Sequence, residues 1–203
     1  MRYGMLPQHA ATAMIALLLP ACLGGCSHVP LTTVYKLATF DPVQADQAVI
    51  RAALRYPDAL TLRKDGARLT LTLQPAGGTT PRRHEFTLVV ADGPGDREPR
   101  LRYARDGDVV AVMRLSDADV ATVRELQAEP HGAGGRLEVS AAACHRGGLP
   151  AGPILTSTFL RLAIADGYMT VLEDFDLRHQ LSAEKLAAEV PPCPAEPPPV
   201  TAR

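Results

Sequence analysis

The sequence predicts a mainly β fold: a single antiparallel β-sandwich or curved sheet of about eight strands with two short helices, an α+β arrangement being the alternative. The first observation is alternation. Leu69, Leu71 and Leu73 are separated by polar residues, with the two-residue period of a half-buried strand. The second is the dipeptide Asp-Gly, which tolerates the positive φ angles of a two-residue hairpin turn. It occurs between apolar runs at 65–66, 106–107 and 166–167.

The start of the domain predicts a turn followed by a strand. Asp41-Pro42 begins a turn or short helix, because aspartate can cap a helix and proline suits its first position. The segment Ile50–Tyr56 fits either a strand or the end of an alanine-rich helix. We favour a helical turn near Asp46 and then a strand, because Pro57 and strong β signals follow directly.

Alternating apolar residues predict the remaining strands. The connections Pro75–Arg83 and Gly93–Arg100 are expected to be the most mobile, because they are rich in turn formers and polar residues. Strands are expected at Phe86–Val90, Leu101–Arg105, Val109–Leu115, Arg136–Cys144, Ile154–Ala163 and Tyr168–Leu172.

Two short helices are predicted by their caps. Ser116 is a good N-cap, and the aspartates in the turn after it complement the helix dipole. A second helix opens at Ser182 and covers Ala183–Val190. The buried stripe of the first helix consists of Val120, Val123 and Leu126.

The N-terminal residues have the layout of a secretory signal peptide. Arg2 supplies one positive charge, and an apolar run from Ala10 to Leu19 ends at Pro20. About ten residues make roughly 15 Å of helix, half of what a bilayer core requires. A cleaved segment therefore fits better than a membrane-spanning one.

Leu23-Gly24-Gly25-Cys26 resembles the lipobox of bacterial lipoproteins, an aliphatic and two small residues before an invariant cysteine. The resemblance implies cleavage between Gly25 and Cys26 and acyl chains on Cys26 that hold the protein on a membrane. It also implies transport to the outer membrane, facing the periplasm, because Ser27 and not aspartate follows. Cys22 competes as an acylation site, and an ordinary signal peptide is the other alternative. The chain is further similar to uncharacterised proteobacterial envelope lipoproteins, which implies a location and no activity.

The expected organisation has four parts: signal peptide 1–25, lipidated N-terminus and tether 26–40, β-rich periplasmic domain 41–190 and proline-rich tail 191–203. Cleavage leaves 203 − 25 = 178 residues, enough for one domain. Arg2 is the only charged residue removed, so the mature formal charge is 20 − 22 = −2. This near-neutral balance gives no footprint for nucleic acid. No cofactor is expected.

Besides Cys26, the expected mature chain contains two cysteines, which are Cys144 and Cys193. In an oxidising periplasm they are candidates for a disulfide, which would close a loop of about 50 residues and stabilise the fold by roughly 4 kcal/mol. The neighbouring pair Cys144-His145 could suggest zinc, but a zinc site needs three or four ligands and no CxxC or HxxxH accompanies it. We therefore favour the disulfide.

Acidic residues gather after the last expected strand. Glu173, Asp174 and Asp176, with His179, could supply ligands to Ca²⁺ or Mg²⁺, but no recognised loop pattern surrounds them. A solvated strand end with salt bridges to Arg178 is the favoured interpretation, and no metal site is predicted.

Several arginines could form a basic patch. In a strand, Arg100 and Arg102 would share one face while Arg105 would lie on the other, so we favour a solvated face over contact with phosphate or lipid headgroups. The other basic residues considered for this patch are Arg82, Arg83, His84 and Arg97.

The glycine-rich segment Gly147–Pro153 lacks the context of a phosphate-binding loop and is expected to be a wide connection.

Three functions follow, in decreasing order of preference. The first is a non-catalytic lipoprotein that binds an envelope protein partner, for example by strand addition at Leu101–Arg105. The second is a module that binds a lipid or small apolar ligand in a cavity between sheet and helix, as an accessory to envelope transport. The third is a periplasmic hydrolase with a dispersed site around Asp174 and His179. We expect no enzyme, since no Gly-x-Ser-x-Gly context or other catalytic motif is present.

Overall fold

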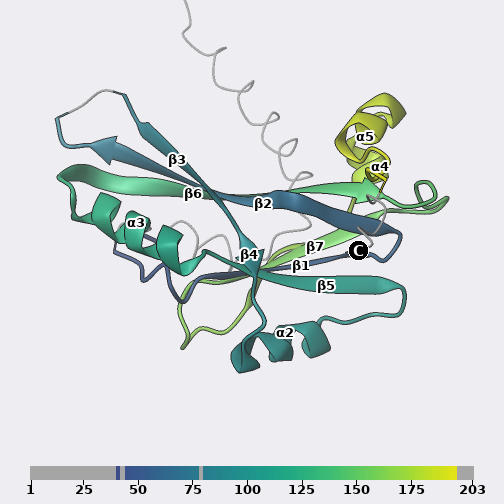
Figure 1. The fold of residues 1–203 in the computed structure, drawn as a ribbon, viewed down its shortest axis with the longest axis horizontal. Coiled ribbons are helices and arrows are strands. Elements are labelled where there is room, and N and C mark those ends of the chain that lie inside the picture. Colours follow the sequence, from purple (N-terminus) through teal and green to yellow (C-terminus); the bar gives the residue numbers. More distant parts are fainter. Residues whose placement is uncertain (1–39, 42–43, 78–79, 196–203) are drawn as a thin grey trace, which may run out of the picture.

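The computed structural model describes residues 40–41, 44–77 and 80–195, and in this part of the chain eight strands form two antiparallel sheets (Figure 1). This confirms the mainly β class and the expected strand number. The five-stranded sheet has the order β4 (Val89–Val90), β5 (Asp108–Arg114), β1 (Arg51–Pro57), β7 (Leu155–Arg161) and β8 (Met169–Asp176). The three-stranded sheet has the order β3 (Arg82–Thr87), β2 (Leu60–Pro75) and β6 (His131–His145).

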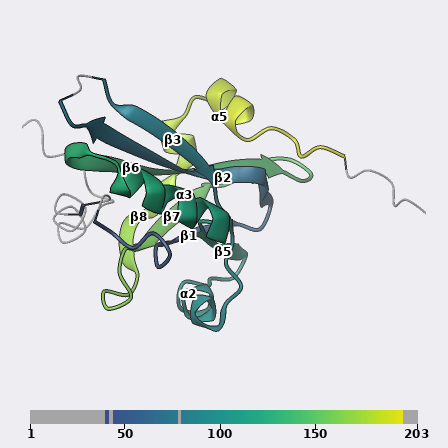
Figure 2. The ribbon, with the colours of Figure 1, turned by 60° about the vertical axis from the view of Figure 1, so that its left-hand side comes forward.

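The two sheets pack as layers with a shared apolar interior (Figures 1 and 2). The leucines of β2 pack with Met113 of β5, and Val139 of β6 packs against Ala52 and Leu160 of the five-stranded sheet. The signal peptide 1–25, the tether up to Thr39 and the end of the tail, 196–203, lie outside the described residues. Among the helices that are described, none is long and apolar enough to cross a membrane.

The chain passes between the sheets at two short connections. β1 and β2 are separated by two residues, and Asp58 N donates to Gly107 O at 2.9 Å there. The segment expected as one strand, Phe86–Val90, is divided: Leu88 N still donates to Ala67 O of β2, whereas Val89 and Val90 pair with β5. Alternation predicts an extended chain, but it does not say where that chain changes partner.

The Asp65-Gly66 pair lies within β2 and forms no hairpin turn, so that prediction was wrong. Asp65 has a φ of 56°, and the register between β2 and β6 shifts between Leu62 and Ala67. Some β-bulges and the two-residue hairpin turn both use left-handed backbone, so Asp-Gly suits either. The bulge lets the even-numbered Leu60 and Leu62 face the same interior as the odd-numbered leucines that follow.

The other two Asp-Gly pairs are turns, but neither is a two-residue hairpin with two positive φ angles. Gly107, with φ 77°, leads from α2 (Arg97–Arg102) into β5. Gly167, with φ 62°, lies in the longer connection of the β7–β8 hairpin. Only the glycine of each pair has a positive φ, whereas the type I′ turn needs two such residues.

The segment predicted as the strand Leu101–Arg105 is not a strand, so that prediction was wrong: it begins in the last turn of a helix and continues without regular structure. The preceding segment Gly93–Arg100 is largely helical, and its mobility stays a prediction. A 3-10 turn, η1 (Pro94–Asp96), continues into α2. The buried Asp96 fixes this turn, because its carboxylate accepts from Gly93 N at 3.2 Å and from Arg51 Nε at 3.1 Å. Tyr103 then stacks on Phe159 with ring centroids 3.7 Å apart, which holds the segment on the outer face of the five-stranded sheet.

The two predicted helices are confirmed. In α3 (Asp117–Ala128) the Ser116 hydroxyl accepts from Asp119 N at 3.1 Å, and the helix buries Val120 and Val123 against the three-stranded sheet. α5 (Ala183–Glu189) is capped by the Ser182 hydroxyl. A four-residue helix, α4 (Leu177–Gln180), was not predicted, and β8 runs four residues past the expected end, Leu172.

The ambiguous start of the domain is a turn followed by β1, as favoured. Ala45 N donates to Asp41 O at 3.1 Å, and Val49 N donates to Asp46 O at 3.2 Å. The strand then begins at Arg51, in the centre of the five-stranded sheet.

Candidate functional site

The main candidate site is an apolar cavity of about 350 Å³ between the two sheets, here called the inter-sheet cavity. Strands β1, β2, β6 and β7 form its walls, and α4 and α5 cover one end. Its lining residues are Leu54, Tyr56, Leu60, Leu62, Val139, Ser140, Ala141, Ala143, Thr156, Thr158, Leu177, Leu181, Glu189 and Val190.

The shape of the cavity follows from residue sizes and from the bulge. β6 contributes the small side chains Ala141 and Ala143, and β7 contributes the short side chains Thr156 and Thr158, so the facing strands leave space between them. Because the bulge precedes Ala67, the leucines before it are also directed inward.

The cover of the cavity is held by side-chain packing and by the C-terminal strap, defined as residues 190–195. Leu186 and Val190 are buried against Leu60 and Ile154. The strap lies beside the end of β6: His145 N donates to Pro191 O and Cys193 N donates to His145 O, both at 3.0 Å.

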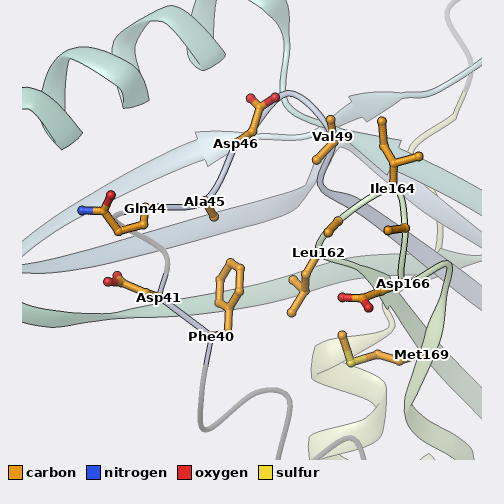
Figure 3. A pocket seen from close by; sticks show the side chains of 12 residues that line it. Phe40, Asp41, Gln44, Ala45, Asp46, Val49, Leu162, Ile164, Asp166 and Met169 are labelled. Atoms are coloured by element: carbon orange, nitrogen blue, oxygen red, sulfur yellow. The ribbon is translucent and has the colours of Figure 1, made fainter.

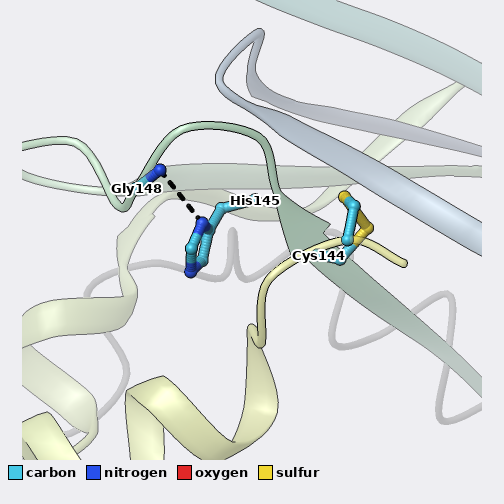
Figure 4. Close-up of a disulfide and its surroundings, with 4 residues drawn as sticks. Cys144, His145 and Gly148 are labelled. Atoms are coloured by element: carbon cyan, nitrogen blue, oxygen red, sulfur yellow. Dashed lines mark hydrogen bonds between the residues drawn. A yellow bond between two sulfur atoms is a disulfide. The ribbon is translucent and has the colours of Figure 1, made fainter. Parts of the chain in front are cut away.

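The predicted disulfide, Cys144–Cys193, is confirmed and ties this strap to β6 (Figure 4). Cys144 is buried, and beside it the ring of His145 accepts a hydrogen bond from Gly148 N at 3.1 Å (Figure 4). The first residues of the predicted tail 191–203 are therefore attached to the domain. The segment Gly147–Pro153 is the wide connection between β6 and β7 that was expected.

The polar groups of the cavity are mostly hydroxyls. Burial raises the pKa of the Tyr56 phenol above its ordinary value, and a hydrogen bond involving the Leu62 backbone partly opposes that shift. Thr156 donates its hydroxyl to Phe175 O at 3.3 Å. Among the described residues of the lining, Glu189 is the one carboxylate and no side chain is basic.

A second, wider hollow of about 650 Å³ lies where the described chain begins (Figure 3). The ring of Phe40 packs with Leu162 and Met169 inside it, and Ile164 on its rim is 71% exposed. It is less enclosed than the inter-sheet cavity, and nothing among the described residues indicates what would cover it. We therefore do not assign it a ligand.

The acidic residues considered for a metal are held by other groups. Asp174 accepts from Arg105 Nη1 at 2.8 Å and is also bonded to Arg55. Asp176 accepts from the backbone N–H groups of Ile154 and Arg178, both at 3.0 Å. Within the described part of the chain, no group of three or more His, Cys, Asp and Glu residues could hold a metal ion.

The sequence analysis favoured salt bridges between these acidic residues and Arg178, and that partner was wrong. Arg178 donates to the backbone carbonyls of Gly152 and Pro150, while the cations beside Asp174 come from Arg55 and Arg105. Arg55 lies on β1 and Arg105 in the turn after α2. Both are far from Asp174 in sequence, so no local pattern predicts that they pair with it.

The hydrolase hypothesis does not gain a catalytic set at Asp174. Ser157, which is buried, accepts from Arg55 Nη2 at 2.7 Å and from Asp174 N at 3.0 Å. Its hydroxyl also donates to Asp174 Oδ1 at 3.5 Å, but that carboxylate is paired with Arg55 and Arg105, which hold its pKa below the ordinary value and so make it a weak general base. His179 lies on α4, and Asp174 contacts Arg55, Arg105 and Ser157 instead.

The arginines considered for a basic patch are mostly paired with carboxylates. Arg100 lies 2.8 Å from Asp92, and Arg102 lies 3.6 Å from Glu98. The expected division between strand faces does not apply, because these residues are helical. The other pairs are Arg82–Glu129, Arg83–Glu85, Arg83–Glu138, Arg105–Glu173 and Arg105–Asp174.

Sequence reasoning missed the residues that make the cavity. Leu177 and Leu181 are four positions apart, the spacing of one helical face, and that signal could have identified the cover. The proximity of β6 to β7 across the gap has no such local signal. The predicted acylation residue Cys26 and the cleavage residue Gly25 lie outside the described residues.

Comparison with protein-family models, curated proteins and solved structures finds no match to this chain.

Proposed function

We propose that this protein is a membrane-anchored envelope lipoprotein whose β-rich domain binds an apolar ligand in the inter-sheet cavity. The cavity itself carries this proposal: it is concave, predominantly apolar, and covered by α4 and α5. Binding sites for small molecules commonly have these properties and a volume of several hundred cubic ångströms. The segment Leu101–Arg105, proposed for strand addition to a protein partner, is not a strand but the end of α2 and the chain that follows it, which moves ligand binding ahead of strand addition.

The anchoring part of the proposal rests on the Leu23-Gly24-Gly25-Cys26 motif and the short apolar run before it. The disulfide supports export, because disulfides persist in oxidising compartments. The intact mass of the protein extracted from membranes tests it. We expect a chain that begins at Cys26 and carries a diacyl or triacyl addition. A chain that retains residues 1–25, or an unmodified Cys26, would contradict the anchor.

Ligand binding is tested by filling the cavity. Ala143 lines it, so Ala143→Phe is expected to weaken binding of the fluorescent apolar probe N-phenyl-1-naphthylamine by at least about tenfold, a loss of roughly 1.4 kcal/mol. The matched control is Ala118→Phe, at an exposed alanine of α3. Circular dichroism and Tm of both variants check folding. Equal affinity of both variants and the parent chain would argue against the cavity as the binding site.

Binding of a protein partner is the second candidate function, and the position of β8 at the edge of its sheet favours it. β8 is an edge strand eight residues long that pairs with β7. Its irregular register and its acidic residues Glu173 and Asp174 are features that discourage strand addition, which is why it ranks second. Site-specific cross-linking from Glu173 in intact cells should capture a partner if this candidate holds; cross-links no different from those formed at Asp117 on α3 would dispose of it.

A further inference from the structure

We infer that the ligand of the inter-sheet cavity is a single-chain amphiphile whose head group carries no negative charge, and that the cavity discriminates against fatty-acid anions. The inference deepens the proposed function and rests on it. Its basis is the size of the cavity and the distribution of charge over its lining.

Size limits the number of chains. A group the size of a water molecule occupies about 30 Å³ in a liquid, and a methylene group is of similar size. A volume of about 350 Å³ therefore accepts roughly a dozen such groups. One alkyl chain fits, and a lipid with two long chains does not.

Charge limits the head group. The described lining residues include the hydroxyl-bearing side chains of Tyr56, Thr156 and Thr158 but no lysine, arginine or histidine. A carboxylate removed from water without a cationic partner loses several kcal/mol of solvation. Hydroxyl groups can instead exchange hydrogen bonds with an alcohol or ester head.

Glu189 adds a preference for a cationic head group over an anionic one. Its carboxylate comes from the last turn of α5, in the cover of the cavity, and its side chain is exposed. A carboxylate there repels an anionic head and attracts a cationic one. Because exposed ion pairs are weak, we expect the effect to be about two- to fivefold in affinity.

Three probes of equal chain length test the inference: 1-dodecanol, dodecylammonium and dodecanoate. Each displaces N-phenyl-1-naphthylamine from the mature chain carrying Cys26→Ser, which cannot be acylated and is handled without detergent. We expect dodecanol to bind at least about tenfold more tightly than dodecanoate at neutral pH, and dodecylammonium to lie between the two, because its ammonium also loses solvation but is attracted by Glu189.

Two variants separate local charge from net charge. Glu189→Lys is expected to strengthen dodecanoate binding and weaken dodecylammonium binding. Glu184→Lys makes the same charge change on the same helix at a position outside the lining, and should leave both affinities unchanged. Equal responses of the two variants would overturn the role of Glu189.

The possible outcomes separate a failure of the head-group inference from a failure of the proposed apolar-ligand binding. If dodecanoate binds as tightly as dodecanol, the head-group inference fails while apolar binding stands. If none of the three probes displaces the dye, or if the dye itself does not bind, the proposed function fails and takes the inference with it.

Discussion

At the residue scale, the least expected feature is a buried guanidinium. Arg55 is 4% exposed at the centre of the five-stranded sheet, where it is bonded to Asp174 and Ser157 and lies 5.9 Å from the ring centroid of Phe159. Its Nε atom lies 3.5 Å from an Asp108 carboxylate oxygen. A buried cation requires such partners, because solvation is lost on folding.

The two members of the Arg55–Asp174 pair should respond differently to removal. Asp174→Ala leaves a buried guanidinium with a weaker set of partners, and we expect a loss of about 3 kcal/mol of unfolding free energy. Arg55→Met leaves a carboxylate that is part-exposed and still paired with Arg105, so we expect about 1 kcal/mol. Urea denaturation of both variants measures the difference. A larger loss for Arg55→Met would contradict the burial argument.

Asp174 also has a left-handed backbone, with φ 49°. Asparagine tolerates this conformation, so Asp174→Asn separates the charge from the backbone effect. Burial raises the pKa of the Asp174 carboxyl, but the hydrogen bonds and charges of Arg105 and Arg55 outweigh it and hold that pKa below its ordinary value. The stabilisation is therefore present above the unfolded-state pKa and is lost as pH falls through the folded-state pKa. Asp174→Asn should remove that part of the acid dependence.

Tyr168 should govern part of the alkaline stability. Burial raises its pKa to about 12, and its buried hydroxyl has no hydrogen-bond partner among the described residues. The unfolded chain ionises first, so stability is full below about pH 10 and falls as pH rises toward about 12. Tyr168→Phe is expected to reduce this fall and to cost no stability at pH 7. Thermal unfolding from pH 7 to 11 measures it, and an unchanged alkaline fall would contradict it.

At the element scale, the bulge of β2 depends on close backbone contact at Gly66. A Cβ atom there would lie 2.7 Å from Ala142 O and 2.9 Å from Arg63 O. Both are backbone atoms, so the contact cannot be relieved by a side-chain rotation. The glycine thus lets β2 and β6 stay paired on both sides of the bulge.

We therefore expect Gly66→Ala to cost about 1–3 kcal/mol of unfolding free energy, through displacement of β2 from β6. The control is Gly95→Ala, because Gly95 has no atom within 4 Å of its ideal Cβ position and no positive φ. Urea denaturation compares the two. Similar losses would show that the close approach is not the cause.

At the scale of the whole molecule, the Cys144–Cys193 disulfide connects the C-terminal strap to the three-stranded sheet and so holds α5 over the cavity. Besides the disulfide, the strap is attached by the two hydrogen bonds to His145 and by the packing of Val190. The covalent bond is thus the strongest restraint on the cover.

The double variant Cys144→Ser/Cys193→Ser is expected to lose about 4 kcal/mol of unfolding free energy, the loop-closure estimate for a loop of this length. Hydrogen exchange should rise most in α5 and the strap, because they lose their covalent attachment. Mass-resolved exchange on the parent and variant measures both effects. Uniform exchange changes across the domain, with α5 no more affected than α3, would contradict the local role.

Sequence patterns predicted the structure correctly where it depends on residues adjacent in the sequence. Ser116 and Ser182 cap α3 and α5 because a hydroxyl before an apolar stripe satisfies free N–H groups. They failed where the same residues suit two structures. Asp65-Gly66 fits a hairpin or a bulge, and the alternation of Leu101 and Tyr103 suggested a strand until the buried Asp96 and Pro99 fixed a helix.

The sequence by itself indicated the β class, the caps of α3 and α5, and the pairing of Cys144 with Cys193. The first depends on short-range periodicity and the second on capping chemistry, and the third follows because the proposed processing at Cys26 would leave only these two thiols to pair. Tertiary structure alone decided the inter-sheet cavity and the Arg55–Asp174 pair. Both require residues from strands a hundred positions apart to meet, and the free energy of such contacts depends on packing that no local pattern encodes.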